Sequence, residues 1–280
     1  MNSNTTLLVW ITLLRPINFI ITAASIFVSC LLAGGTDTQM LSMIFASFGG
    51  ALIGGGGMVI NDIYDIEIDK INKPERPLPR GVITKFDAAL YYAALSCAGL
   101  MMSYQASWNA FLIALYAVPA IFLYSYKLKS TPLAGNVLVG ALTGLAFIYG
   151  GAAVGNIRQA IIPAVFAFLI NVGREIIKDM EDVVGDEKLG AVTFPIKYGM
   201  KVSANVATIF LMSVIVSTLF PYFAHHYGIK YFILVNLGVN AVLLYLIFSL
   251  RKDTSERNLH CISTVLKYDM FVGLLAIYVG

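Results

Sequence analysis

The chain consists of long apolar stretches separated by short polar segments. A helix needs about 20 apolar residues to cross a hydrocarbon layer of about 30 Å, and nine stretches of the sequence are long enough. They lie at residues 10–34, 39–60, 86–105, 107–126, 132–155, 159–178, 203–223, 229–249 and 262–279. The pattern predicts an all-α, polytopic membrane protein with nine transmembrane helices, which form a single domain over residues 1–280.

The composition agrees with this pattern and excludes several classes of protein. Hydrophobic residues make up 58% of the chain and charged residues only 12%, and the mean hydropathy is +0.78. Soluble domains carry about 25% charged residues, and disordered chains need low hydrophobicity. Three scattered cysteines cannot build a disulfide scaffold. The net charge of +3 is too small and too dispersed to indicate nucleic-acid binding.

The basic residues lie almost entirely on one side of the predicted membrane. Of the 19 Lys and Arg residues, all but Arg158 and Lys230 fall in the N-terminal segment or in the loops that follow even-numbered spans. Because cytoplasmic loops carry the excess of Lys and Arg, the N-terminus is predicted in the cytoplasm and the C-terminus outside. An odd number of spans, such as nine, satisfies this arrangement.

Acidic residues concentrate in two loops, at about 61–85 and 174–201, which follow spans two and six and are predicted to form cytoplasmic caps. Within each loop three aspartates are spaced three and four residues apart, so that on a helix they share one stripe. Asn61 joins the first stripe and Glu175 the second, whereas Glu67 and Glu181 point the opposite way. The two rows are Asp62, Asp65 and Asp69, and Asp179, Asp182 and Asp186. We expect each row to lie on a helix that continues past the end of its span.

Carboxylates at this spacing repel one another, so two equivalent rows are better explained by a ligand than by solvated helix ends. Oxygen ligands suit Mg²⁺, which is usually completed by substrate phosphates. We therefore expect the two rows to face each other and to hold more than one Mg²⁺, with a diphosphate bridging between the ions. The candidate metal ligands are Asn61, Asp62, Asp65, Asp69, Asp179, Asp182 and Asp186, and the candidate catalytic residues are Asp65, Asp182 and Tyr64.

Basic residues beside the rows are candidates for binding the substrate. Arg suits phosphate oxygens through paired hydrogen bonds and Lys suits them as a point charge, although the positive-inside rule alone explains most single bases. The candidate substrate-binding residues are Arg15, Asn18, Lys73, Arg76, Arg80, Lys127, Arg174 and Lys178.

With these motifs the sequence resembles the UbiA superfamily of intramembrane prenyltransferases. That family carries NDxxDxxxD after its second helix and DxxDxxxD after its sixth, and both motifs are intact here. The pairs Arg15-Pro16 and Arg76-Pro77, the latter preceded by Asn72-x-Pro74, are also similar to the family. The resemblance implies nine helices around a central cavity, a cytoplasmic cap built from the two acidic loops, and a side portal to the lipid.

Within the superfamily, the segment from Arg174 to Asp186 is most similar to the archaeal digeranylgeranylglyceryl phosphate synthases. This resemblance implies Mg²⁺-dependent transfer of a prenyl group from geranylgeranyl diphosphate to the glycerol hydroxyl of geranylgeranylglyceryl phosphate. The implied partners are the prenyl diphosphate, the lipid-phosphate acceptor and membrane lipid, with no nucleic acid and no required protein partner.

Three other functions are compatible with acidic rows in a membrane protein. A prenyltransferase of the same family can use an aromatic acceptor such as a quinone precursor. An integral-membrane hydrolase of lipid diphosphates could use the same metals with water as the acceptor. A divalent-cation transporter also places acids in membrane helices, but its site usually lies near the midplane between inverted repeats, whereas both rows here leave the membrane on one side.

Overall fold

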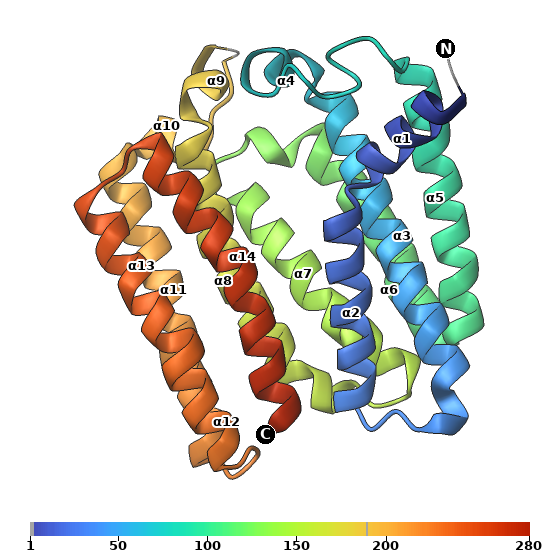
Figure 1. Cartoon of the computed structure of the whole chain (residues 1–280), viewed down its shortest axis with the longest axis vertical. Coiled ribbons are helices and arrows are strands. Elements are labelled where there is room, and N and C mark those ends of the chain that lie inside the picture. The colour runs from blue at the N-terminus through green and yellow to red at the C-terminus, as the bar shows by residue number, and fades with distance from the viewer. Residues whose placement is uncertain (1–2, 189) are drawn as a thin grey trace. The chain divides into compact units, whose positions relative to one another are not determined.

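The computed structural model describes residues 3–188 and 190–280, and the side chains of residues 8–71, 73–188 and 190–280. Helices joined by short loops make up these residues, with no strand among them, as predicted (Figure 1). The α-helices are α1 (Ser3–Leu14), α2 (Pro16–Leu32), α3 (Met40–Tyr64), α4 (Ile66–Asn72), α5 (Lys85–Ala106), α6 (Trp108–Tyr126), α7 (Ala134–Ala153), α8 (Ile157–Glu181), α9 (Val183–Lys188), α10 (Phe194–Tyr198), α11 (Met200–Phe223), α12 (Ile229–Leu234), α13 (Ala241–Lys252) and α14 (Glu256–Val279). Short helical turns lie at η1 (Asp37–Gln39), η2 (Leu128–Ser130) and η3 (Val235–Asn240), the last a turn of π-helix.

The predicted membrane spans all fall on helical segments, but fewer than nine are apolar enough to be counted. In the described residues seven helices are long and apolar enough to cross a membrane: α3, α6, α7, α8, α11, α12 continued through α13, and α14. The number becomes eight if α1 and α2 are one broken span. Helix α5 has the predicted length but is less apolar. The chain is an integral membrane protein, and the count of nine stays a prediction.

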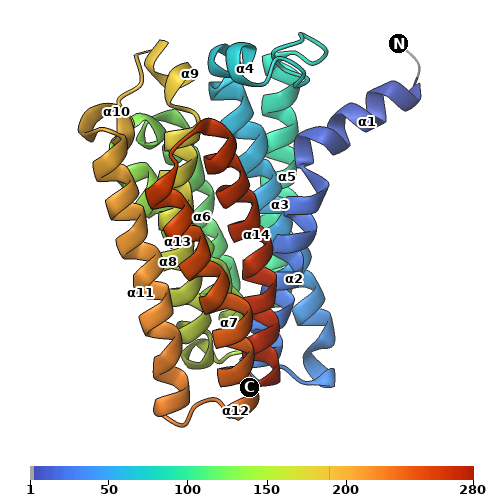
Figure 2. The ribbon, with the colours of Figure 1, turned by 60° about the vertical axis from the view of Figure 1, so that its left-hand side comes forward.

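The first predicted span is broken rather than continuous, because Pro16 follows Arg15. Proline has no N–H to donate and disfavours helical backbone in the residue before it. Arg15 adopts a left-handed conformation with φ 52°, and the chain bends by 49° between Leu8–Leu14 and α2. Figure 2 shows α1 leaving the axis of α2. A hydropathy pattern averages over such a break and cannot detect it.

The chain divides into two compact units, and the predicted single domain stays a prediction. Unit 1 comprises Met1–Leu128 and Leu145–Ala160. Its centre is α3, which packs most extensively against α5 and also contacts α2 and α6. The α3–α5 contact depends on small residues, which let membrane helices approach closely. A Cβ atom at Gly99 would lie 2.8 Å from the carbonyl oxygen of Gly49.

Unit 2 comprises Lys129–Gly144 and Ile161–Gly280. In it α14 packs against α12, η3 and α13, and α11 packs against α13. Polar side chains bond across the buried side of these helices: Thr218 donates to Asn240 at 3.1 Å and Asn240 donates to Asn236 at 3.1 Å. The first bond joins α11 to η3 and the second lies within η3, and both pair polar groups in an apolar surrounding. The short polar helices α4 and α9 follow the long helices α3 and α8, and they contain residues of the two acidic rows.

Candidate active site

The first acidic row lies where α3 passes into α4. The helix is interrupted at Asp65, so the predicted continuous helix is wrong in this detail. Asp65 still donates its backbone N–H to the carbonyl of Asn61 at 2.9 Å, and Asp69 donates to Asp65 at 2.7 Å, which keeps the row in helical register. Asp62, Asp65 and Asp69 are only 3%, 4% and 2% exposed. Buried carboxylates need compensating partners, so a solvated helix end does not describe this row.

Two arginines supply compensating charge to the first row. Arg15, at the break between α1 and α2, forms an ion pair with Asp62. Arg76, in the loop after α4, places Nη1 3.0 Å from Oδ1 of Asp62 and 2.5 Å from Oδ2 of Asp69. Burial alone would lower the pKa of Arg76, but the facing carboxylates outweigh burial and raise it. Burial raises the pKa of Asp69, and the guanidinium of Arg76 opposes that rise.

The side chain of Asn61, which joins the first row, has one polar atom with a hydrogen-bond partner and one without. Its Nδ2 donates to Oδ2 of Asp65 at 2.6 Å. Its Oδ1 is buried and has no hydrogen-bond partner within the described residues. A buried oxygen without a partner is a cost that a bound cation would remove. The chemistry of this atom fits a metal ligand, and the role of Asn61 as one stays a prediction.

The second row runs from the end of α8 into α9. The interruption falls at Asp182, between the two helices, so the predicted continuous helix is wrong in this detail here too. Backbone hydrogen bonds again keep the row in helical register. The N–H of Asp182 donates to the carbonyl of Lys178 at 2.9 Å, and the N–H of Asp186 donates to the carbonyl of Asp182 at 3.1 Å. Asp186 is 7% exposed. Asp179 accepts a hydrogen bond from Nδ2 of Asn136 at 2.8 Å.

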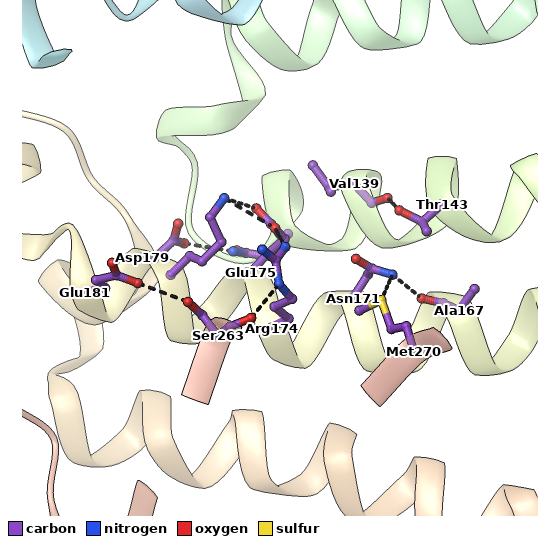
Figure 3. Close-up of polar contacts among 12 residues, drawn as sticks. Val139, Thr143, Ala167, Asn171, Arg174, Glu175, Asp179, Glu181, Ser263 and Met270 are labelled. Atoms are coloured by element: carbon purple, nitrogen blue, oxygen red, sulfur yellow. Dashed lines mark hydrogen bonds and ion pairs between the residues drawn. The ribbon is translucent and has the colours of Figure 1, made fainter. Parts of the chain in front are cut away.

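A cluster of charged groups precedes the second row on α8 (Figure 3). Glu175 lies 3.0 Å from Nη1 of Arg174 and 3.2 Å from Nζ of Lys178. Arg174 also donates from Nε to the backbone carbonyl of Ser263 in α14 at 3.1 Å. Glu181, at the end of α8, also contacts Ser263, whose hydroxyl donates to it at 3.2 Å. Its orientation away from the aspartate stripe stays a prediction.

The remaining candidate residues are Tyr64, Arg80, Lys127, Lys73 and Asn18, and their predicted roles stay predictions. The ring of Tyr64 contacts Phe122 and Tyr126 of α6, with centroids 6.1 Å and 5.7 Å away, so its catalytic role stays a prediction. Arg80 and Lys127 are exposed, and Lys73 and Asn18 are partly buried. The side chain of Asn72, part of the proline-rich motif, lies outside the described residues.

The residues of the two rows fit Mg²⁺ in their chemistry. All candidate ligands carry hard oxygen atoms, which is the donor set that Mg²⁺ prefers. No group of three or more His, Cys, Asp or Glu side chains in the described ranges is already arranged around one point. At the first row, Arg15 and Arg76 pair with oxygens of Asp62 and Asp69. The two rows belong to different units, and their predicted convergence stays a prediction.

Two features of the site are not predicted by the sequence: the bond of Asn136 to Asp179 and the pairing of Glu175 with two bases. Asn136 is 43 residues from Asp179 along the chain, and no local spacing links the two. Glu175 shares the stripe of the second row, and the neighbouring bases Arg174 and Lys178 are the feature of the sequence that favours its pairing with cations.

Comparisons with known proteins agree with the two motifs. The model of the UbiA prenyltransferase family matches residues 22–272. The chain is 38% identical to the digeranylgeranylglyceryl phosphate synthase of Thermococcus kodakarensis over 275 residues, 97% of each chain. A solved structure reported as giving insights into digeranylgeranylglyceryl phosphate synthase in membranes shares 35% identity and a TM-score of 0.79, over 98% of both chains. A UbiA homologue from Archaeoglobus fulgidus, solved with GPP and Mg²⁺, shares the fold at 19% identity and a TM-score of 0.64, over 96% of this chain and 99% of that chain.

Proposed function

We propose that this chain, which belongs to the UbiA prenyltransferase family, has the activity of a digeranylgeranylglyceryl phosphate synthase. It would transfer the geranylgeranyl group of geranylgeranyl diphosphate to the glycerol hydroxyl of geranylgeranylglyceryl phosphate. The observation that carries the proposal is the 38% identity to the Thermococcus kodakarensis synthase along nearly the whole of both chains. Aromatic prenyl acceptors remain the alternative within the family.

The candidate ligands of both rows hold Mg²⁺ in this proposal. They are Asn61, Asp62, Asp65, Asp69, Asp179, Asp182 and Asp186. The solved homologue from Archaeoglobus fulgidus with GPP and Mg²⁺ supports a divalent metal. Bound there, Mg²⁺ would neutralise the diphosphate and stabilise the charge that develops on the leaving oxygen.

The chain's own residues supply the rest of the reaction. Arg15 and Arg76 contribute positive charge beside the first row, and we assign them to the diphosphate oxygens. The bond between the allylic carbon and the bridging oxygen breaks, diphosphate leaves, and the acceptor hydroxyl oxygen bonds to that carbon. The hydroxyl proton passes to a carboxylate of the rows or to the departing diphosphate. Apolar helices exclude water, which would otherwise capture the allylic cation as free prenol.

The active site is placed on the cytoplasmic side. The predicted topology puts both acidic loops on the side that carries nearly all Lys and Arg residues, and the positive-inside rule assigns that side to the cytoplasm. The same topology puts the N-terminus in the cytoplasm and the C-terminus outside. Accessibility of cysteines introduced at Lys201 and at Lys230 to an impermeant reagent, in intact cells, tests this orientation. Labelling of the residue 201 cysteine but not the residue 230 cysteine would overturn it.

Product identification tests the activity. Membranes containing the protein are incubated with geranylgeranyl diphosphate and either geranylgeranylglyceryl phosphate or an aromatic quinone precursor, and the lipid products are identified by mass spectrometry. The proposal expects digeranylgeranylglyceryl phosphate. A prenylated aromatic product alone would assign the aromatic activity, free prenol alone would indicate a hydrolase, and no consumption of the diphosphate would revive a transport function.

A further inference from the structure

The charged cluster on α8 is organised around one nearly buried carboxylate. The side chain of Glu175 is 11% exposed, and it lies 3.0 Å from Arg174 Nη1 and 3.2 Å from Lys178 Nζ. The Arg174 side chain is 21% exposed and is fixed at a second point, because its Nε donates to the carbonyl of Ser263 on α14 at 3.1 Å. Two bases from successive turns of one helix are therefore held together.

This arrangement differs from that of bases which only mark the cytoplasmic side. Long basic side chains near a membrane surface normally extend toward water, and a surface base needs no buried carboxylate. Here Glu175 draws both bases onto one face, leaving a net charge of about +1 among the three groups. Fixing the bases in advance lowers the entropic cost of binding an anion. The cluster has the composition of a preformed anion site.

We propose that Arg174 and Lys178, held in place by Glu175, bind the phosphate of the acceptor lipid. The inference rests on the proposed function, because it assigns the cluster to the phosphate of the acceptor in that function. Arg174 and Lys178 contact the substrate in this proposal, and Glu175 is a positioning residue that acts through them.

The charge of the acceptor is the first argument for this assignment. A phosphomonoester carries a charge of about −1.5 to −2 at pH 7, so any carboxylate of the second row that no cation neutralises repels it. Asp179 and Asp182 lie on or at the end of the same helix as the cluster. An acceptor phosphate that approaches this row must be held by cations beside it. The Arg174–Lys178 pair supplies them, and Asp179 itself is engaged by Asn136.

Spacing along the helix is the second argument. In the acceptor, the reacting hydroxyl and the phosphate are on adjacent carbons, so the phosphate must bind only a few ångströms from the reacting centre. Lys178 precedes Asp182 by one helical turn, about 6 Å along the axis at 1.5 Å per residue. The donor diphosphate already has Arg15 and Arg76 beside the first row. Arg174 and Lys178, beside the second row, are then available for the acceptor.

Kinetics with two acceptors test the proposal. Geranylgeranylglyceryl phosphate is compared with its phosphate-free analogue, geranylgeranylglycerol, in the wild type and in Arg174→Gln and Lys178→Gln. Each variant should raise the KM for the phosphorylated acceptor about tenfold or more. The KM for geranylgeranyl diphosphate and the turnover of the analogue should change less than about threefold. Lys201→Gln, an exposed base at the start of α11, is the matched control and should match the wild type.

Glu175→Gln distinguishes positioning from a general structural role. It should raise the KM for the phosphorylated acceptor while kcat at saturating acceptor and the KM for the donor stay close to wild type. Glu256→Gln, an exposed glutamate in the same unit, is its control. If Glu175→Gln fails to accumulate in membranes, the Arg174 and Lys178 variants decide the question alone.

The outcomes separate this inference from the proposed function. Failure of the wild type to make digeranylgeranylglyceryl phosphate overturns both. If the wild type makes this product, two results for the variants would overturn only the phosphate site. One is a raised KM for the donor, and the other is an unchanged preference for the phosphorylated acceptor.

Discussion

Nη1 of Arg76 lies 2.5 Å from Oδ2 of Asp69. Both side chains are largely buried, at 20% and 3% exposure, and the same nitrogen also reaches Asp62 at 3.0 Å. A guanidinium between two buried carboxylates offsets their repulsion, so the loop after α4 contributes directly to the stability of the first row.

Replacing Arg76 should therefore destabilise the protein. In Arg76→Gln, the carboxylates of Asp62 and Asp69 lose a charged partner, and removing one member of a buried ion pair is costly. We expect a loss on the order of 2 kcal/mol, reduced here because Arg76 is partly exposed. Thermal unfolding in detergent measures it, with Arg80→Gln, an exposed arginine of the same loop, as the control. Equal melting temperatures for the two variants would contradict the structural role.

Removing a central carboxylate from either row should abolish turnover. Asp65→Ala and Asp182→Ala each delete an oxygen ligand but leave the apolar spans unchanged, so both proteins should reach the membrane in normal amounts. Product formation is measured in membranes adjusted to equal protein content. Glu67→Gln, at an exposed position paired with Lys70, should keep wild-type activity. Activity retained in both alanine variants would remove the rows from the mechanism.

Removal of divalent metal should stop the reaction reversibly. Chelation with EDTA should abolish product formation, and excess Mg²⁺ should restore it, because the hard oxygen ligands of the rows require a hard cation. Asn61→Leu should need a higher Mg²⁺ concentration for half-maximal activity, since it removes the buried Oδ1 that lacks a partner. Full activity of the wild type in EDTA would exclude metal assistance.

The close contact between α3 and α5 predicts a packing defect. A methyl group at Gly99 would lie 2.6 Å from Cγ1 of Ile53 and 2.8 Å from the carbonyl oxygen of Gly49. Gly99→Ala should therefore cost about 1–3 kcal/mol through overpacking. Gly54→Ala is the matched control, because its nearest neighbour, Thr22, is 3.7 Å away. Denaturation in detergent that finds Gly99→Ala as stable as Gly54→Ala would show that the helices can separate without penalty.

Periodicity and motif spacing predicted most of the fold and the local part of the site. Long apolar runs predict helices because burial in lipid requires internally bonded backbone. The 3-4 spacing predicted the helical register that the backbone bonds of each aspartate row keep, but not the breaks at Asp65 and Asp182. The break at Arg15 was missed because one proline changes the backbone without changing average hydropathy. Asn136 was missed because its bond to Asp179 depends on packing between distant segments. The pairing of Glu175 with two bases likewise depends on rotamers, which spacing alone does not specify.

Asp62 joins Arg15, from the kink in the first span, to Arg76, from the loop after α4. It is thus a mechanical junction between two segments as well as a candidate ligand. A knockout at this position would disturb the kink and the loop at once, and a mutational screen would score it as essential whatever its share in metal binding. The loss of activity in an Asp62 variant therefore combines the loss of its ion pairs with the loss of a candidate metal ligand. Variants of Arg15 and Arg76 in the same background are needed to separate the two effects.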